Sequence, residues 1–188
     1  MQYVEKLDFS FDIDSLRRGL DEVLRVCSWH PHHSQIGITQ SIGPDAAETW
    51  HDATGSLFYK WGSDAFDTDG QLKKLDNPKT ESDFKFFVKE FSHTIFKDVH
   101  YQLSCKYKLG RIRLMNSRTR SCLSWHTDSE KRLHIPIITN PGARLVIEDT
   151  ANHLPADGSV YLADTTKYHT AFNSGSENRI HLVACILD

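Results

Sequence analysis

From about residue 110 onward, apolar and polar residues alternate along the chain in short runs. This period of two is typical of β-strands that bury one face. Five such runs are expected to be strands: 111–116, 132–139, 143–149, 158–163 and 179–187. Loops rich in Asn, Pro, Gly and Asp separate them. Residues 35–40 form a further candidate strand. The second half of the chain is therefore expected to form a sandwich or barrel of short strands.

The first half shows helical spacing in two places. Apolar residues recur every three or four positions over 13–27, where Asp12 or Asp14 is placed to cap a helix. A second helix is expected over 81–96, since Thr80 and Asp83 resemble a capping box. Its apolar stripe, expected to be core, consists of Phe84, Phe87, Val88, Phe91 and Ile95. Helices followed by strands indicate an α+β chain, mainly β, with helices packed on one sheet.

The totals limit the class of protein. The 188 residues fit one domain, with helical support over about 1–100 and a strand core over about 105–188. Hydrophobic residues make up 39% and charged residues 25%, which favours neither disorder nor a membrane span. The net charge of -3 gives no reason to expect nucleic acid as a partner. The polar segment 63–79 is expected to be a mobile surface loop.

The cysteines and the N-terminus indicate the compartment. None of the four cysteines forms a CxxC pair or a zinc spacing. The first residues show no basic region followed by an apolar stretch, so no signal peptide is expected. Free thiols in a cytoplasmic protein are the simplest interpretation, although an even count also permits disulfides. The sequence does not indicate an oligomeric state.

One short motif carries a chemical signal. His126 and Asp128 are separated by one residue, so on an extended chain both side chains point to the same side. With a second imidazole they form a two-histidine, one-carboxylate set, which suits iron(II) and leaves coordination positions open. His169 is the best candidate for that imidazole, and His153 is a rival in a loop. The alternative is a histidine that merely hydrogen-bonds to a nearby acid.

Arg179 follows His169 by ten residues, across a short turn. Strands joined by a short turn pair as neighbours, so this arginine is expected near the metal. Its planar guanidinium is suited to hold a carboxylate by two parallel hydrogen bonds. The alternative is a solvated charge at the end of a strand.

Two strands carry a basic face opposite an apolar face. Arg132 and His134 alternate with Leu133, Ile135 and Ile137, and Arg179 and His181 alternate with Ile180, Leu182, Ala184 and Ile186. A polar pocket backed by a hydrophobic layer produces this pattern. An amphipathic strand with its polar side in water also produces it.

Together these residues resemble a known family. Residues 110–115, 125–128, 132–137, His169 and 179–183 are similar to the aspartyl/asparaginyl and proline hydroxylases, which belong to the 2-oxoglutarate-dependent oxygenases. The resemblance covers roughly residues 110–188 well. It implies a double-stranded β-helix, a jelly-roll and cupin relative, with N-terminal helices packed on its larger sheet. Asp128 departs from the aspartyl hydroxylase branch, which lacks this carboxylate, and resembles the free-proline hydroxylase branch.

The resemblance also implies roles for the residues. Fe(II) is expected on His126, Asp128 and His169, and Arg179 is expected to hold the distal carboxylate of 2-oxoglutarate. Arg132 and His134 match further cosubstrate contacts. The implied reaction uses O2 and releases succinate and CO2 while a free amino acid such as proline is hydroxylated. The alternatives are an Asp, Asn or Pro residue in a peptide, a non-catalytic jelly-roll module that binds a carboxylate, and a metal enzyme without 2-oxoglutarate, against which Arg179 argues.

Four arginines are candidates to bind a substrate carboxylate: Arg111, Arg113, Arg118 and Arg120. For each of them a solvated position is the alternative. Asn173 is expected either to reach the pocket or to shape the turn after it. The histidine-rich segment with His30, His32 and His33 is expected to be a solvated loop.

Overall fold

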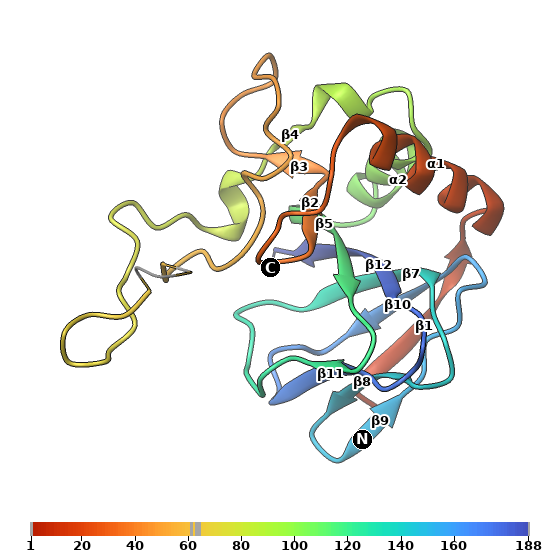
Figure 1. The fold of residues 1–188 in the computed structure, drawn as a ribbon. Helices are drawn as coiled ribbons and strands as arrows, with labels where there is room; N and C mark the ends of the chain where they lie inside the picture. The colour runs from red at the N-terminus through yellow and green to blue at the C-terminus, as the bar shows by residue number, and fades with distance from the viewer. Residues whose placement is uncertain (1, 61, 63–64, 188) are drawn as a thin grey trace.

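The computed structural model describes residues 2–60, 62 and 65–187. Two sheets face each other and the helices cover the outer face of the larger one (Figure 1). The larger, six-stranded sheet has the order β1-β10-β7-β12-β5-β2 and the smaller one the order β6-β11-β8-β9. The large sheet consists of β1 (Val4–Ser10), β10 (Ser159–Ala163), β7 (Arg132–Ile138), β12 (Arg179–Ile186), β5 (Leu109–Ser117) and β2 (Gln35–Gly37). The small sheet consists of β6 (Ser121–Cys122), β11 (His169–Asn173), β8 (Ala143–Ile147) and β9 (Thr150–Asn152).

The remaining elements precede β5. They are α1 (Ile13–Val26), β3 (Thr39–Gln40), the 3-10 turn η1 (Glu81–Asp83), β4 (Phe86–Phe87), the 3-10 turn η2 (Lys89–Phe91) and α2 (Ile95–Ser104). All strand pairs are antiparallel. This mainly β arrangement of two sheets with two helices confirms the expected jelly-roll fold. No helix among the described residues is long and apolar enough to cross a membrane.

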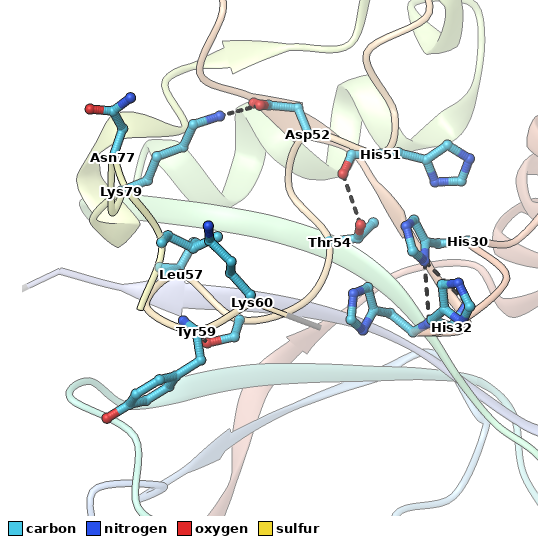
Figure 2. A pocket seen from close by; sticks show the side chains of 13 residues that line it. His30, His32, His51, Asp52, Thr54, Leu57, Tyr59, Lys60, Asn77 and Lys79 are labelled. Carbon is cyan, nitrogen blue, oxygen red and sulfur yellow. Dashed lines mark hydrogen bonds and ion pairs between the residues drawn. The ribbon is translucent and has the colours of Figure 1, made fainter. Parts of the chain in front are cut away.

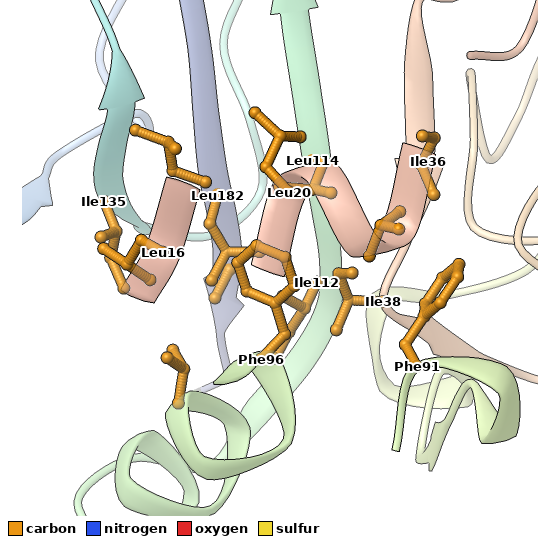
Figure 3. Packing of buried hydrophobic residues seen from close by; sticks show 14 of the residues in the cluster. Leu16, Leu20, Ile36, Ile38, Phe91, Phe96, Ile112, Leu114, Ile135 and Leu182 are labelled. Carbon is orange, nitrogen blue, oxygen red and sulfur yellow. The ribbon is translucent and has the colours of Figure 1, made fainter. Parts of the chain in front are cut away.

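The main core lies between the helices and the large sheet (Figure 3). Leu16 and Leu20 of α1 and Phe96 of α2 pack onto this sheet and are almost completely buried. The sheet contributes Ile112, Leu114, Ile135 and Leu182, of which Ile135 and Leu182 come from the faces predicted to be apolar. The predicted strand phase is therefore confirmed. A smaller apolar cluster with Leu145, Ile147 and Tyr161 packs between the two sheets.

The first helix begins where the sequence predicts. Asp12 is its N-cap, and its carboxylate accepts a hydrogen bond of 2.7 Å from the amide of Ser15. Asp12 rather than Asp14 is therefore the cap. Gly19 allows α1 to approach α2, because a Cβ there would lie 2.5 Å from the side chain of Ile95.

The prediction of one helix over 81–96 is wrong. The capping box of Thr80 and Asp83 is present, but it starts only the single turn η1. The chain then pairs with β3 through β4, and α2 starts only at Ile95, capped by Thr94. Four residues of the expected stripe are nevertheless buried, namely Phe84, Phe87, Val88 and Phe91. The chain buries these side chains although its backbone is irregular here, so their spacing did not determine the conformation.

The expectation that β11 and β12 pair as neighbours is also wrong. β11 belongs to the small sheet and β12 to the large one, so the turn between them crosses from one sheet to the other. Asn173 is fully buried and directs this turn: its side-chain amide donates to the carbonyl oxygens of Ser117 and Glu177 and its oxygen accepts from Gly175. Asn173 therefore shapes the turn.

Candidate metal and cosubstrate site

The three predicted metal ligands lie close together at the start of β11 in the small sheet. His126 lies before β7 and pairs with His169 through two backbone hydrogen bonds of 3.0 and 2.8 Å. The amide of Asp128 donates to the carbonyl of Thr165, which places the carboxylate beside both rings. One ligand atom from each of the three residues lies within 4.8 Å of the others. The structure therefore brings His126, Asp128 and His169 together as one group.

Both imidazoles are oriented by their own backbone. Nδ1 of His126 lies 2.7 Å from the carbonyl oxygen of Ser124, and Nδ1 of His169 lies 2.9 Å from that of Lys167. A carbonyl only accepts, so Nδ1 carries the proton in each ring and Nε2 keeps its lone pair. This second contact is the usual support of a metal-binding histidine. The set offers two imidazole nitrogens and a carboxylate oxygen.

Asp128 is charged at neutral pH. Burial alone would raise its pKa, but the hydrogen bond and charge of Arg132 outweigh burial and lower it. Nε of Arg132 donates to Oδ2 of Asp128 at 3.0 Å. Burial lowers the pKa of His169, so this imidazole is neutral and free of a competing proton. The protonation states of these ligands thus suit a divalent cation.

The inner face of the large sheet carries the predicted basic residues. Val183 of β12 lies opposite His134 of β7 on one side and opposite Arg113 of β5 on the other. Three nitrogen atoms of this face are buried and make no hydrogen bond within the described part of the chain: Nε of Arg113, Nη1 of Arg132 and Nε2 of His134. Unpaired buried polar atoms of this kind are rare in folded proteins and indicate a ligand or ordered water.

Arg179 is buried at the start of β12. Its guanidinium lies against the ring of His181, with Nη2 3.0 Å from Nδ1. No carboxylate of the described residues lies within ion-pair distance of this guanidinium. Burial lowers the pKa of Arg179 to about 10, so it remains charged at neutral pH. Burial also lowers the pKa of His134 to about 3, and that of His181 well below its usual range. Arg179 is therefore a buried cation beside neutral imidazoles.

The four arginines proposed for the substrate have different surroundings. Arg111 is bound to Glu81 through Nε and Nη2 and donates to the carbonyls of Ala53 and Gly55 through Nη1. Arg118 and Arg120 are exposed, and Arg118 donates to Ser34. Arg113 is buried and donates to Gln35, which leaves its Nε unpaired. Only Arg113 combines burial with a free donor.

The rival ligand and the other histidines lie apart from the metal group. Nδ1 of His153 faces the carbonyl of Ala143 at 3.2 Å. His30, His32, His33 and His51 line a separate cavity of about 500 Å³ together with Lys60 and Lys79 (Figure 2). The rings of His30 and His33 stack with centroids 4.5 Å apart. Within the described residues, these histidines do not bring three ligand atoms to one point. The segment is a loop with His32 exposed, as expected, and it also lines this cavity.

Comparisons with known proteins bear on this site. Residues 21–187 match the family described as Aspartyl/Asparaginyl beta-hydroxylase. The chain belongs to the aspartyl/asparaginyl beta-hydroxylase family. Enzymes of this family are hydroxylases that depend on Fe(II) and 2-oxoglutarate, which are therefore the cofactors of this chain. Among curated proteins, no match to the chain was found.

Solved structures of other proteins are similar to this chain in fold. An oxidoreductase of the 2OG-Fe(II) oxygenase family from Burkholderia pseudomallei is 15% identical, with 97% of this chain and 83% of that chain covered and a TM-score of 0.51. The viral collagen prolyl hydroxylase of Paramecium Bursaria Chlorella virus-1, in its 2OG complex, is 10% identical, with 98% and 95% covered and a TM-score of 0.52. At these identities the likeness shows the fold alone.

The residues fit both cofactors of the aspartyl/asparaginyl beta-hydroxylase family. Two imidazole nitrogens and one carboxylate oxygen on one side of a metal suit Fe(II) and leave open positions. A dicarboxylate such as 2-oxoglutarate would supply acceptors to the buried guanidinium of Arg179 and to the unpaired donors of Arg132 and His134. The structure thus places a candidate metal-binding group next to a basic face with unpaired buried nitrogens.

Sequence reasoning missed Glu81 and Gln35. Glu81 is buried and forms ion pairs with both Arg111 and Arg132. Gln35 accepts hydrogen bonds from Arg113 and from the amide of Gly55. Both lie far from the strand motifs in the sequence, and no spacing links them to the site. The alternation of β5, which turns Arg111 and Arg113 inward, was the only available signal that such partners are needed.

Proposed function

We propose that this protein hydroxylates a free amino acid, proline or a similar one, with release of succinate and CO2. The observation that carries the proposal is the buried, acid-free guanidinium of Arg179 on the same sheet face as the unpaired donors of Arg132 and His134. Fe(II) would be held by His126, Asp128 and His169. When bound, iron and 2-oxoglutarate supply the oxidation that places one oxygen atom of O2 on the substrate.

The chain positions the reactants. Arg179 would hold the distal carboxylate of 2-oxoglutarate by charge-assisted hydrogen bonds. Nη1 of Arg132 and Nε2 of His134 would donate to the remaining oxygens of 2-oxoglutarate. Because the pKa of His134 is depressed to about 3, this ring stays neutral and donates from one nitrogen only. The same buried face excludes water around the reacting atoms.

Among the four candidate arginines, we assign the substrate carboxylate to Arg113. It is buried, its Nε has no partner, and Gln35 fixes its Nη1 at 3.0 Å. Arg111 has its donors engaged by Glu81 and two carbonyls, and we give it a structural role. Arg118 and Arg120 are exposed and would gain less from the same charge pairing.

A residue within a peptide is the second candidate substrate. The observation that favours it is the cavity of about 500 Å³ lined by His30, His33 and His51, because Gln35 joins Arg113 to Gly55 beside this cavity. Residues that flank a target residue would have room there. A free amino acid would leave this space unused.

A succinate-release assay with Fe(II) and 2-oxoglutarate tests the proposal. Free amino acids, their carboxyl amides and short peptides are compared at equal concentration. We expect free amino acids to be turned over and their amides to lose most activity, since Arg113 would be left unpaired. Arg113→Met should raise the substrate KM, whereas Arg118→Met, the matched control, should not.

Two outcomes of this assay overturn parts of the proposal. Equal turnover of an amide or an internal peptide residue replaces the free-amino-acid assignment with the peptide one. Binding of 2-oxoglutarate without succinate release, with every substrate, supports a non-catalytic binding module instead. We also propose a cytoplasmic location, because all four cysteines are free thiols.

A further inference from the structure

Glu81 connects two arginines of the inner sheet face. It sits in η1, in a chain segment outside the large sheet, and its side chain is 5% exposed. Oε1 lies 3.0 Å from Nη2 of Arg111 and 2.9 Å from Nη2 of Arg132, and Oε2 accepts from Nε of Arg111 at 3.2 Å. Gly110 allows this approach, since a Cβ there would lie 2.9 Å from the carbonyl oxygen of Glu81.

Arg132 divides its three nitrogens among different neighbours. Nε donates to Asp128 at 3.0 Å, and Nη2 forms an ion pair with Glu81 at 2.9 Å. Nη1 is buried and has no hydrogen-bond partner among the described residues. A guanidinium is planar, so two contacts fix the direction of the third nitrogen. Glu81 therefore determines how Arg132 lies against Asp128 and where Nη1 points.

We propose that Glu81 is a positioning residue for the metal carboxylate, acting through Arg132. The inference rests on the proposed role of Asp128 as an iron ligand. Arg111, Arg113 and Arg132 carry three positive charges on this face. Glu81 and Asp128 are the carboxylates that form ion pairs with Arg132, while Glu130 has a carboxylate oxygen within 4.8 Å of that of Glu81. With Glu81 charged, Asp128 accepts only one nitrogen of Arg132 and keeps an oxygen for the metal.

Loss of the charge on Glu81 changes this distribution. Asp128 becomes the one remaining ion-pair partner of Arg132 among the described residues, and Nη2 of Arg132 turns from position 81 toward it. A carboxylate held by both nitrogens of one arginine is a poorer metal ligand, because its lone pairs are engaged. Replacement of a residue that supports a metal ligand typically weakens metal affinity roughly 10–100-fold.

The test is Mn(II) affinity under anaerobic conditions, measured by electron paramagnetic resonance on the full chain. We expect Glu81→Gln to weaken Mn(II) binding roughly 10–100-fold, and Glu81→Asp, which keeps the charge, to recover most of it. The decisive comparison is a double-mutant cycle. In an Arg132→Met background, Glu81→Gln should have no further effect on Mn(II) affinity.

Arg111→Met is the matched control. It removes the other ion pair of Glu81 and the contacts to Ala53 and Gly55, so it should lower the thermal midpoint while Mn(II) affinity stays near that of the wild type. Should Glu81→Gln fail to fold, Arg132→Met carries the comparison with Arg111→Met, because it removes the group through which Glu81 acts on Asp128. Equal Mn(II) affinities in Arg132→Met and Arg111→Met would overturn the inference.

The Mn(II) measurements distinguish a wrong role for Glu81 from a wrong metal assignment. Unchanged Mn(II) affinity in Glu81→Gln, or an equal effect with and without Arg132, contradicts the positioning role alone. Wild-type affinity that is insensitive to His126→Ala contradicts the metal assignment itself.

Discussion

The two faces of the large sheet are built from the same strands and are buried to a similar degree, yet they perform opposite tasks. Ile135 is 1% exposed on the face under the helices and its neighbour His134 is 7% exposed on the inner face. Burial of apolar surface stabilises the first face by roughly 25 cal/mol per Å². On the second face, burial of guanidinium and imidazole groups opposes folding unless partners compensate it. Because side chains alternate along a strand, a residue that stabilises the fold and a residue proposed to bind the cosubstrate can be direct neighbours in the sequence.

The largest expected effect concerns the metal group beside the inner face. His126→Ala removes one of three metal ligands and should abolish iron-dependent succinate release while the free energy of unfolding changes little. His153→Ala, a histidine outside the group, is the control and should retain activity. Full activity in His126→Ala would show that the metal assignment is wrong.

The second largest effect is expected at Arg179, the buried cation of the inner face. Arg179→Ala loses charge-assisted hydrogen bonds worth about 1.5–3 kcal/mol each, so the KM for 2-oxoglutarate should rise more than roughly tenfold. No buried carboxylate loses its partner, so stability should hold. The exposed Arg120→Ala serves as the control. An unchanged KM for 2-oxoglutarate would exclude Arg179 from this role.

A substitution on the apolar face should lower stability and leave cosubstrate binding nearly unchanged. Ile135→Ala leaves a cavity under the helices, and the free energy of unfolding should fall by about 2–5 kcal/mol. The KM for 2-oxoglutarate should change little in the fraction that remains folded. Urea denaturation measures the first quantity and steady-state kinetics the second. A large change in KM without loss of stability would show that the two faces are not separable.

The smallest effect is a pH dependence of stability. The pKa of His134 is about 3 in the folded protein, and that of His181 is also depressed. In the unfolded chain histidines titrate near about 6.5. Below that pH the unfolded state binds more protons, so each ring should lower stability by up to about 1.4 kcal/mol per pH unit as the pH falls toward about 5. His134→Gln should flatten this slope in urea denaturation, and an identical slope would contradict the buried neutral state.

The parts predicted correctly from sequence depend on local patterns. The alternation in 132–137 and 179–184 identifies both sheet faces, because side chains of a strand alternate regardless of which strands pair. The close approach of His126 and Asp128 follows for the same reason, since they are two residues apart, while their role as metal ligands stays a prediction. The pairing of β11 with β12 was predicted wrongly, because the turn after Asn173 crosses between sheets through contacts that only the folded chain supplies.

In the first hundred residues, local patterns predicted only part of the structure. The phenylalanines of 84–91 are buried as expected, but no helix contains them, since burial does not depend on a particular backbone. β1 and β2 also join the large sheet from this region. Glu81 reaches Arg111 and Arg132 across thirty and more positions, and a contact of that range has no sequence period.

The central claim is that Fe(II) and 2-oxoglutarate bind together between His126, Asp128, His169 and Arg179. Anaerobic titration of the wild-type protein with Fe(II) and 2-oxoglutarate, followed by visible absorption, tests it most directly. We predict a charge-transfer band that needs both additions, is lost in His126→Ala, and requires more 2-oxoglutarate in Arg179→Ala. Absence of the band in the folded wild type, or an identical band in His126→Ala, would contradict the account.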